Sequence, residues 1–135
     1  MIDLALLILR VVIGAIFIAH GAQKLFGSFG GPGLEGTTGF FGQLGIKPAG
    51  AMALAAGLAE FVGGILLAAG FLTPIAALAL IATMAVAVVK VHLGNGFFAT
   101  EGGYEYNLAL SVVALTFILA GAGAYSLDAA IGFFW

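Results

Sequence analysis

The fold is decided by residues 61–89, which read FVGGILLAAGFLTPIAALALIATMAVAVV and contain no charged side chain. A membrane-spanning helix needs about 20 mostly apolar residues, so this run is long enough to enter more than one span. Thr73-Pro74 divides it, because proline is tolerated in the first turn of a helix and disfavours helix in the residue before it. The run therefore predicts a tight hairpin of two helices, at about residues 49–71 and 74–93.

Two further apolar segments flank this hairpin, at about residues 4–26 and 106–124. Hydrophobic residues make up 63% of the 135 residues and charged residues 7%, whereas a soluble domain is about 25% charged. This composition excludes a soluble globule, a disordered chain and a nucleic-acid binder. We therefore expect an all-α integral membrane four-helix bundle, a single transmembrane domain over residues 1–135, with both termini on one side of the bilayer.

The connection between the first two predicted spans carries a glycine at every third position from Gly27 to Gly45. The collagen triple helix has this period but needs abundant proline and three chains, so we exclude it. A turn through residues 30–33, followed by a short helix near Thr38 to Leu44, fits the segment better. We expect that helix to lie at the membrane interface, with its phenylalanines in the headgroup boundary, or to fold back over the bundle as a re-entrant lid.

Ionisable side chains inside a membrane are costly and usually mark a functional site. Helical spacing places Arg10 on one stripe of the first helix with Gly14 and Gly21, and it places Glu60 on a small-residue stripe of the second helix. Small residues on a charged face indicate contact with protein. Counting about 1.5 Å per residue puts Glu60 near the midplane and within reach of Arg10. We predict an Arg10–Glu60 ion pair, which either locks the helix register or takes part in chemistry.

A second polar cluster lies toward the loop side of the predicted bundle. It comprises His20, Gln23, Lys24, Lys90, His92 and the loop residue Tyr104. These side chains could form a vestibule that donates hydrogen bonds to carbonyl or anionic oxygens. Each also has a plain structural interpretation: the lysines as anchors that reach the interface, the histidines as packing residues and the tyrosine as part of an aromatic belt.

Cofactor chemistry is limited by the residues available. The chain has no cysteine, which excludes disulfides, iron–sulfur clusters and thiolate metal sites. His20 and His92 are the minimum pair for a haem, but no cluster of haem-facing residues accompanies them. We therefore expect neither haem nor a metal site.

The orientation in the membrane stays open at this point. Lys24, Lys47 and Lys90 lie toward the loop side and only Arg10 toward the termini, a count that would place the loops in the cytoplasm. Three of these four side chains are candidates for a functional role inside the membrane. The count therefore does not decide the orientation.

Several segments resemble the DoxX family, and together they span nearly the whole chain. They are Leu9-Arg10 with residues 17–26 (FIAHGAQKLF), residues 31–37 (GPGLEGT), residues 58–64 (LAEFVGG), residues 91–98 (VHLGNGFF) and residues 102–106 (GGYEY). The resemblance implies a four-helix protein of a bacterial or archaeal plasma membrane. It also implies association with membrane oxidoreductase systems, with quinone-linked sulfur oxidation in some members and with resistance to quinone or oxidative stress in others.

The polar cluster and this resemblance together favour a membrane subunit of a quinone-linked oxidoreductase system, with a quinone-like ligand in a polar-lined pocket between helices. The expected catalytic residues are Glu60, Arg10 and His20, of which Glu60 and His20 would relay the protons that quinone reduction consumes. The expected ligand-binding residues are Lys24, Gln23, Lys90, His92, Tyr104, Phe17 and Phe61.

No redox centre is evident in the chain itself, so electrons would come from a bound cofactor or a partner oxidoreductase subunit. The competing interpretation is a non-enzymatic membrane component. Such a component would anchor or assemble a partner enzyme, or carry a small hydrophobic solute. The glycine and alanine stripes also suit a homo-oligomer in the lipid bilayer.

Overall fold

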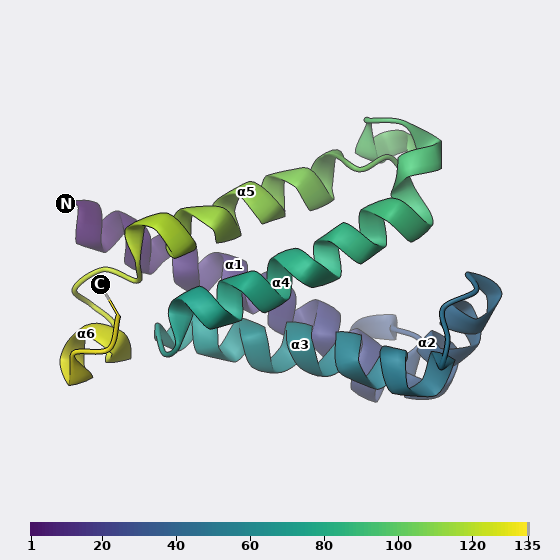
Figure 1. Ribbon diagram of the computed structural model, residues 1–135, viewed down its shortest axis with the longest axis horizontal. Coiled ribbons are helices and arrows are strands. Elements are labelled where there is room, and N and C mark those ends of the chain that lie inside the picture. Colours follow the sequence, from purple (N-terminus) through teal and green to yellow (C-terminus); the bar gives the residue numbers. More distant parts are fainter. Residues whose placement is uncertain (135) are drawn as a thin grey trace.

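The computed structural model describes residues 1–134, and the regular structure in that range is helical (Figure 1). The helices are α1 (Ile2–Phe26), α2 (Gly33–Gln43), α3 (Ala49–Ala69), α4 (Thr73–Ala87), α5 (Glu105–Ala120) and α6 (Leu127–Ile131). By length and composition, α1, α3 and the segment Thr73–Asn95 are able to cross a membrane, whereas α5 is apolar but has 16 residues. The expected all-helical membrane protein is confirmed at this level.

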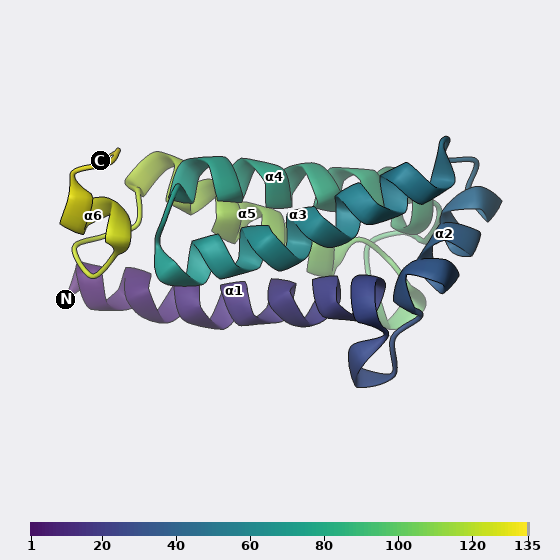
Figure 2. The ribbon, with the colours of Figure 1, turned by 90° about the horizontal axis from the view of Figure 1, so that it is seen from below.

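The N-terminus and the last described residues lie at one end of the molecule, as the hairpin arrangement requires (Figures 1 and 2). The opposite end holds α2 and the α4–α5 connection. We name these the terminal end and the loop end. Between them, α4 continues beyond its α-helical part as a π-helix (Val88–His92) and a 3₁₀ turn (Leu93–Asn95).

Helices α1 and α3 run antiparallel and meet backbone to backbone through glycines (Figure 2). A Cβ atom added at Gly14 would lie 2.7 Å from the carbonyl oxygen of Gly64, and one added at Gly21 would lie 2.4 Å from the backbone nitrogen of Phe61. Small residues permit such close approach between membrane helices. The contact fixes which residues of the two helices stand at the same height.

Helices α4 and α5 complete an apolar core. Phe17 of α1 and Leu67 of α3 are buried in one cluster with Leu80 of α4 and Phe117 of α5. Because the four long helices all contribute to this cluster, each packs one face inward and leaves the opposite, equally apolar face exposed. That distribution suits a lipid environment, where exposed apolar side chains carry no penalty.

The turn between α3 and α4 forms where Thr73-Pro74 predicts it. Helix α3 ends at Gly70, which has a φ angle of 70°, and Pro74 occupies the first turn of α4. The carboxylate of Asp128 accepts hydrogen bonds from the N–H groups of Leu72 at 2.8 Å and Thr73 at 2.9 Å. These bonds satisfy backbone donors that the start of a helix leaves free.

Two segments near the C-terminus differ from the prediction. Helix α5 ends at Ala120 rather than near residue 124, because Gly121 and Gly123 adopt φ angles of 77° and 85° that do not continue a helix. The short helix α6 follows, with the side chain of Ser126 accepting a hydrogen bond from the N–H of Ala129. The apolar pattern gave no reason to expect a break there.

Helix α2 lies within the glycine-rich segment and begins about one turn earlier than predicted, directly after Pro32. It docks on the end of α1 through the buried Thr37, whose hydroxyl is 2.7 Å from the carbonyl oxygen of Gly33 and 3.3 Å from that of Lys24. Phe40 of the same helix is exposed. The placement of α2 at a membrane interface remains a prediction.

The α1–α3 contact predicts that Gly21→Ala destabilises the protein by about 1–3 kcal/mol, because the added methyl group collides with the backbone of Phe61. The matched control is Gly39→Ala in α2, where nothing lies within 4 Å of the added atom and alanine favours helix. Thermal unfolding in detergent should show a lower melting temperature for Gly21→Ala only. Equal melting temperatures for both variants would contradict the backbone contact.

Candidate functional site

Glu60 stands in the middle of α3 and is 3% exposed. Its carboxylate oxygens accept hydrogen bonds from the ammonium of Lys24 at 3.1 and 2.9 Å. Lys24 lies in the last turn of α1 and keeps 26% of its side chain exposed. The predicted ion pair between Arg10 and Glu60 is therefore wrong, since the carboxylate pairs with Lys24.

The register of the α1–α3 contact explains the correct pairing. Gly21 meets Phe61, and each step forward along α1 moves the facing position one step back along α3. Glu60 thus faces the last turns of α1, whereas Arg10 stands beside Gly70. Ten residues separate Glu60 from Gly70, which is about 15 Å along the helix axis.

Arg10 is fully buried at the terminal end and holds segments of the chain together. One guanidinium nitrogen donates to the carbonyl oxygen of Ala68 at 3.1 Å, and another donates to that of Tyr125. A side chain at Gly70 would collide with the guanidinium, and Asp128 lies close enough to act on it electrostatically. Arg10 therefore joins α1, the end of α3 and the segment before α6.

His20 and Phe61 lie next to the ion pair. His20 precedes Lys24 by one helical turn, so both project from one face of α1. Its ring lies 6.3 Å, centroid to centroid, from that of Tyr106 at the start of α5. Phe61 follows Glu60 and packs edge-to-face on Phe26 at 5.3 Å.

Two other predicted ligand-binding residues belong to the connection between α4 and α5. A ring nitrogen of His92 lies 2.8 Å from the carbonyl oxygen of Gly102, within hydrogen-bonding distance. The ring of Tyr104 packs edge-to-face on Phe97, with 5.5 Å between centroids. Both side chains therefore shape this loop.

The remaining predicted residues are spread over different environments. Gln23 donates to the carbonyl oxygen of Phe29 at 3.4 Å, at the base of the glycine-rich segment. Lys90 is exposed on the π-helical turn and forms no ion pair within residues 1–134. Phe17 is 1% exposed in the apolar core. Their assignment to a ligand site stays a prediction.

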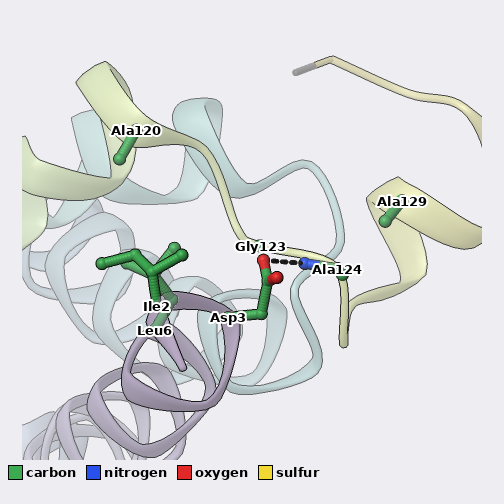
Figure 3. Close-up of a pocket in the computed structure, with 7 residues that line it drawn as sticks. All are labelled: Ile2, Asp3, Leu6, Ala120, Gly123, Ala124 and Ala129. Carbon is green, nitrogen blue, oxygen red and sulfur yellow. Dashed lines mark hydrogen bonds between the residues drawn. The ribbon is translucent and has the colours of Figure 1, made fainter.

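The described residues 1–134 form a cavity near each end of the molecule. The first, which we name the terminal cleft, has a volume of about 410 Å³. It is lined by Ile2, Asp3, Leu6, Ala120, Gly123, Ala124 and Ala129 (Figure 3). Inside it, the Asp3 carboxylate accepts a hydrogen bond from the N–H of Ala124 at 2.9 Å. The cleft thus has apolar walls and one polar side chain, an acceptor.

The second cavity, which we name the α5 groove, has a volume of about 480 Å³. It is lined by Phe97, Ala99, Glu105, Tyr106, Leu108 and Ala109. Tyr106 therefore borders the groove and also contacts His20. Within residues 1–134, no three histidine, aspartate or glutamate side chains come close enough to hold a metal ion.

Sequence reasoning missed two residues that organise the structure. Asp128 was not among the predicted site residues, yet it is 1% exposed and caps α4. A local sequence signal near Asp128 is Ser126, an N-cap residue that marks the start of a short helix and so indicates an ordered segment there. Tyr106 was not among the predicted site residues, and its contact with His20 depends on distant chain segments that no local pattern reveals.

The comparison with protein families agrees with this architecture. A family model described as DoxX matches residues 5–93, which include all but the first residues of α1, the glycine-rich segment, α3 and α4. The chain belongs to the DoxX family. The matched region contains both members of the Lys24–Glu60 pair and ends just before the loop that borders the α5 groove.

Three curated relatives match most of the chain. An uncharacterized protein of Haemophilus influenzae is 37% identical over 89% of this chain and 85% of its own length. A Bacillus subtilis protein named "Putative oxidoreductase CatD" is 32% identical over 93% of this chain and 86% of its own length. The "Uncharacterized membrane protein Rv3486" of Mycobacterium tuberculosis is 30% identical over 89% of this chain and 77% of its own length. No solved structure matches the chain significantly.

The ion pair predicts that removing either charge costs more than removing both. Lys24→Met should destabilise the protein by about 1–3 kcal/mol. Breaking a fully buried ion pair costs about 3–5 kcal/mol, and the cost is smaller here because Lys24 is partly solvated. Glu60→Met should have a similar effect. The double variant should recover much of the loss, because apolar side chains can replace a buried pair.

A double-mutant cycle of thermal unfolding in detergent measures this coupling. Lys47→Met, at an exposed position, is the matched control and should leave the melting temperature unchanged. Strictly additive effects of Lys24→Met and Glu60→Met would show that the two side chains do not interact.

Proposed function

We propose that this DoxX-family protein is an integral membrane component of a quinone-linked oxidoreductase system in a bacterial or archaeal plasma membrane. The observation that carries the proposal is the Lys24–Glu60 pair within the spanning helices, because ionisable groups at such positions are expensive and usually functional. The name of the Bacillus subtilis relative supports an oxidoreductase setting. A role in resistance to oxidative stress belongs to the same proposal.

The proposal includes α5 as the fourth span. Its 16 residues extend about 24 Å as an α-helix, somewhat less than the hydrocarbon thickness of about 30 Å. A short span is accommodated by local thinning of the bilayer and by flanking polar groups that reach the interface. The termini and the loops then lie on opposite sides of the membrane.

The donor set beside the ion pair fits a quinone. Two N–H groups of Lys24 serve Glu60, which leaves the third available, and neither the His20 ring nor the Tyr106 hydroxyl has a hydrogen-bond partner within residues 1–134. Phe61 supplies an aromatic surface nearby. A bound quinone would supply the electron-accepting ring and two carbonyl oxygens that take hydrogen bonds and protons.

The residues of this chain have separable roles in the proposal. Lys24 holds the Glu60 carboxylate in place through two hydrogen bonds, and its third N–H can face a carbonyl oxygen. Glu60 and His20 are the groups able to exchange protons with that site. Arg10 stands at the terminal end, about 15 Å along the helix axis from the level of Glu60, so it serves the structure.

A non-enzymatic anchor for a partner enzyme is the second candidate. Phe26, Phe29 and Phe40 are exposed at the loop end, where α2 projects from the bundle. Such a surface suits an aromatic contact with another subunit as well as with lipid headgroups. The two candidates differ in whether the protein itself holds a quinone.

The test of the proposed function is the presence of quinone in the purified protein. Protein isolated in lipid nanodiscs should release quinone on solvent extraction, measured by mass spectrometry, in an amount well above that of empty nanodiscs. The folded double variant Lys24→Met/Glu60→Met should retain several-fold less, while Lys47→Met should match the natural chain. Absence of enrichment in the natural chain would refute quinone binding and favour the anchor.

The proposal also includes an orientation in the membrane. Arg10 is buried among carbonyl groups and therefore does not act as a flanking charge, whereas Lys47 and Lys90 are exposed toward the loop end. The positive-inside rule then places the loop end in the cytoplasm and the terminal end outside.

The chain has no cysteine, so single introduced cysteines report the orientation cleanly. With a membrane-impermeant maleimide on intact cells, Ala130→Cys should react, and Gln43→Cys should react only after the cells are permeabilised. Both positions are exposed. The reverse order of reaction would show that the loop end faces outward.

A further inference from the structure

The α5 groove lies beside the first turns of α5, on a surface that the bundle leaves open. Tyr106 is 44% exposed and Leu108 is 46% exposed at its border. Its walls are mainly apolar, and its volume of about 480 Å³ falls within the range of about 300–1,000 Å³ typical of small-molecule pockets. A groove of this size with apolar walls suits an apolar ligand.

The loop that walls the groove is held in one shape by its own hydrogen bonds. The N–H of Gly103 donates to the carbonyl oxygen of Phe98 at 2.8 Å, and the N–H of Glu105 donates to that of Phe97 at 2.9 Å. A side chain at Gly103 would collide with the backbone of Gly96. A preformed wall lowers the ordering cost of binding a ligand.

Aromatic and polar groups meet at this groove. Phe97 packs edge-to-face on both Phe98 and Tyr104, so its ring is fixed at the wall. The Glu105 carboxylate accepts a hydrogen bond from the N–H of Ala99 at 3.2 Å. Tyr106 brings a hydroxyl that has no partner in the described chain.

We infer that the α5 groove binds the ring of the quinone-like ligand, with the Tyr106 hydroxyl donating to one of its carbonyl oxygens. This inference rests on the proposed function and adds the place of binding and a residue for it. His20, 6.3 Å from Tyr106 between ring centroids, links the groove to the helix that carries Lys24. Edge and face contacts with Phe97 suit a flat ring.

The terminal cleft is the rival location, and its chemistry differs. Its polar side chain is Asp3, whose carboxylate accepts hydrogen bonds and donates none when ionised. A quinone carbonyl oxygen also only accepts, so neither Asp3 nor the Glu105 carboxylate of the α5 groove can bind it while ionised. The α5 groove offers a hydroxyl donor and an aromatic wall, and the terminal cleft offers neither.

Photoaffinity labelling with an azido-quinone tests the inference on the full chain in nanodiscs. Saturable labels should map by mass spectrometry to residues 97–109. Tyr106→Phe, which removes one hydrogen bond worth about 0.5–1.5 kcal/mol, should raise the half-saturating quinone concentration by about two- to tenfold. Tyr125→Phe, an exposed tyrosine at the terminal end, is the matched control and should leave it unchanged.

The outcomes separate the inference from the proposed function. Saturable labels at residues 2–6 and 120–129 would overturn the α5 groove while supporting quinone binding by the protein. Labels at residues 97–109 with equal affinity in Tyr106→Phe would overturn the hydrogen bond assigned to Tyr106. An absence of saturable labelling anywhere would overturn both the inference and the proposed function. Melting temperatures of the two tyrosine variants control for folding.

Discussion

The contact between the glycine-bearing faces of α1 and α3 is the constraint on which the rest of the structure depends. At Gly14 and Gly21 the opposing backbone lies so close that a single methyl group has no room. In a bilayer, where apolar side chains gain little by leaving lipid, such close packing supplies much of the attraction between helices. It also prevents sliding, because any shift of one helix along the other brings larger side chains against the glycines.

This fixed register decides how the charges inside the bundle are compensated. It sets Lys24 beside Glu60, and it sets Arg10 beside the end of α3, where backbone carbonyl groups of Ala68 and Tyr125 receive its guanidinium. Hydrocarbon tolerates such side chains only when they are paired in this way. Asp128 completes the terminal end by capping α4, and so ties the C-terminal segment to the α3–α4 turn.

The sequence predicts the helices and their charged faces well, because both follow from local periodicity. The apolar run divided at Thr73-Pro74 and the glycine stripes can both be read directly from the sequence. The axial register of two helices cannot be read from local sequence, since it depends on which glycine meets which backbone atom. This is why Arg10 was wrongly predicted as the partner of Glu60. The contact of Tyr106 with His20 likewise depends on segments far apart in the chain, whereas α5 ends because Gly121 and Gly123 adopt backbone angles that leave the helix.

Arg10 and the Lys24–Glu60 pair differ in exposure and in unused hydrogen-bond donors, and this difference bears on function. Arg10 is completely enclosed and bonds to backbone of two distant segments, which is what a purely structural cross-link requires. Lys24 is about a quarter exposed and retains an N–H group beyond the two that serve Glu60. A cross-link gains nothing from an accessible, unused donor, whereas a binding site needs one. The Lys24–Glu60 pair is therefore the better place to seek ligand chemistry.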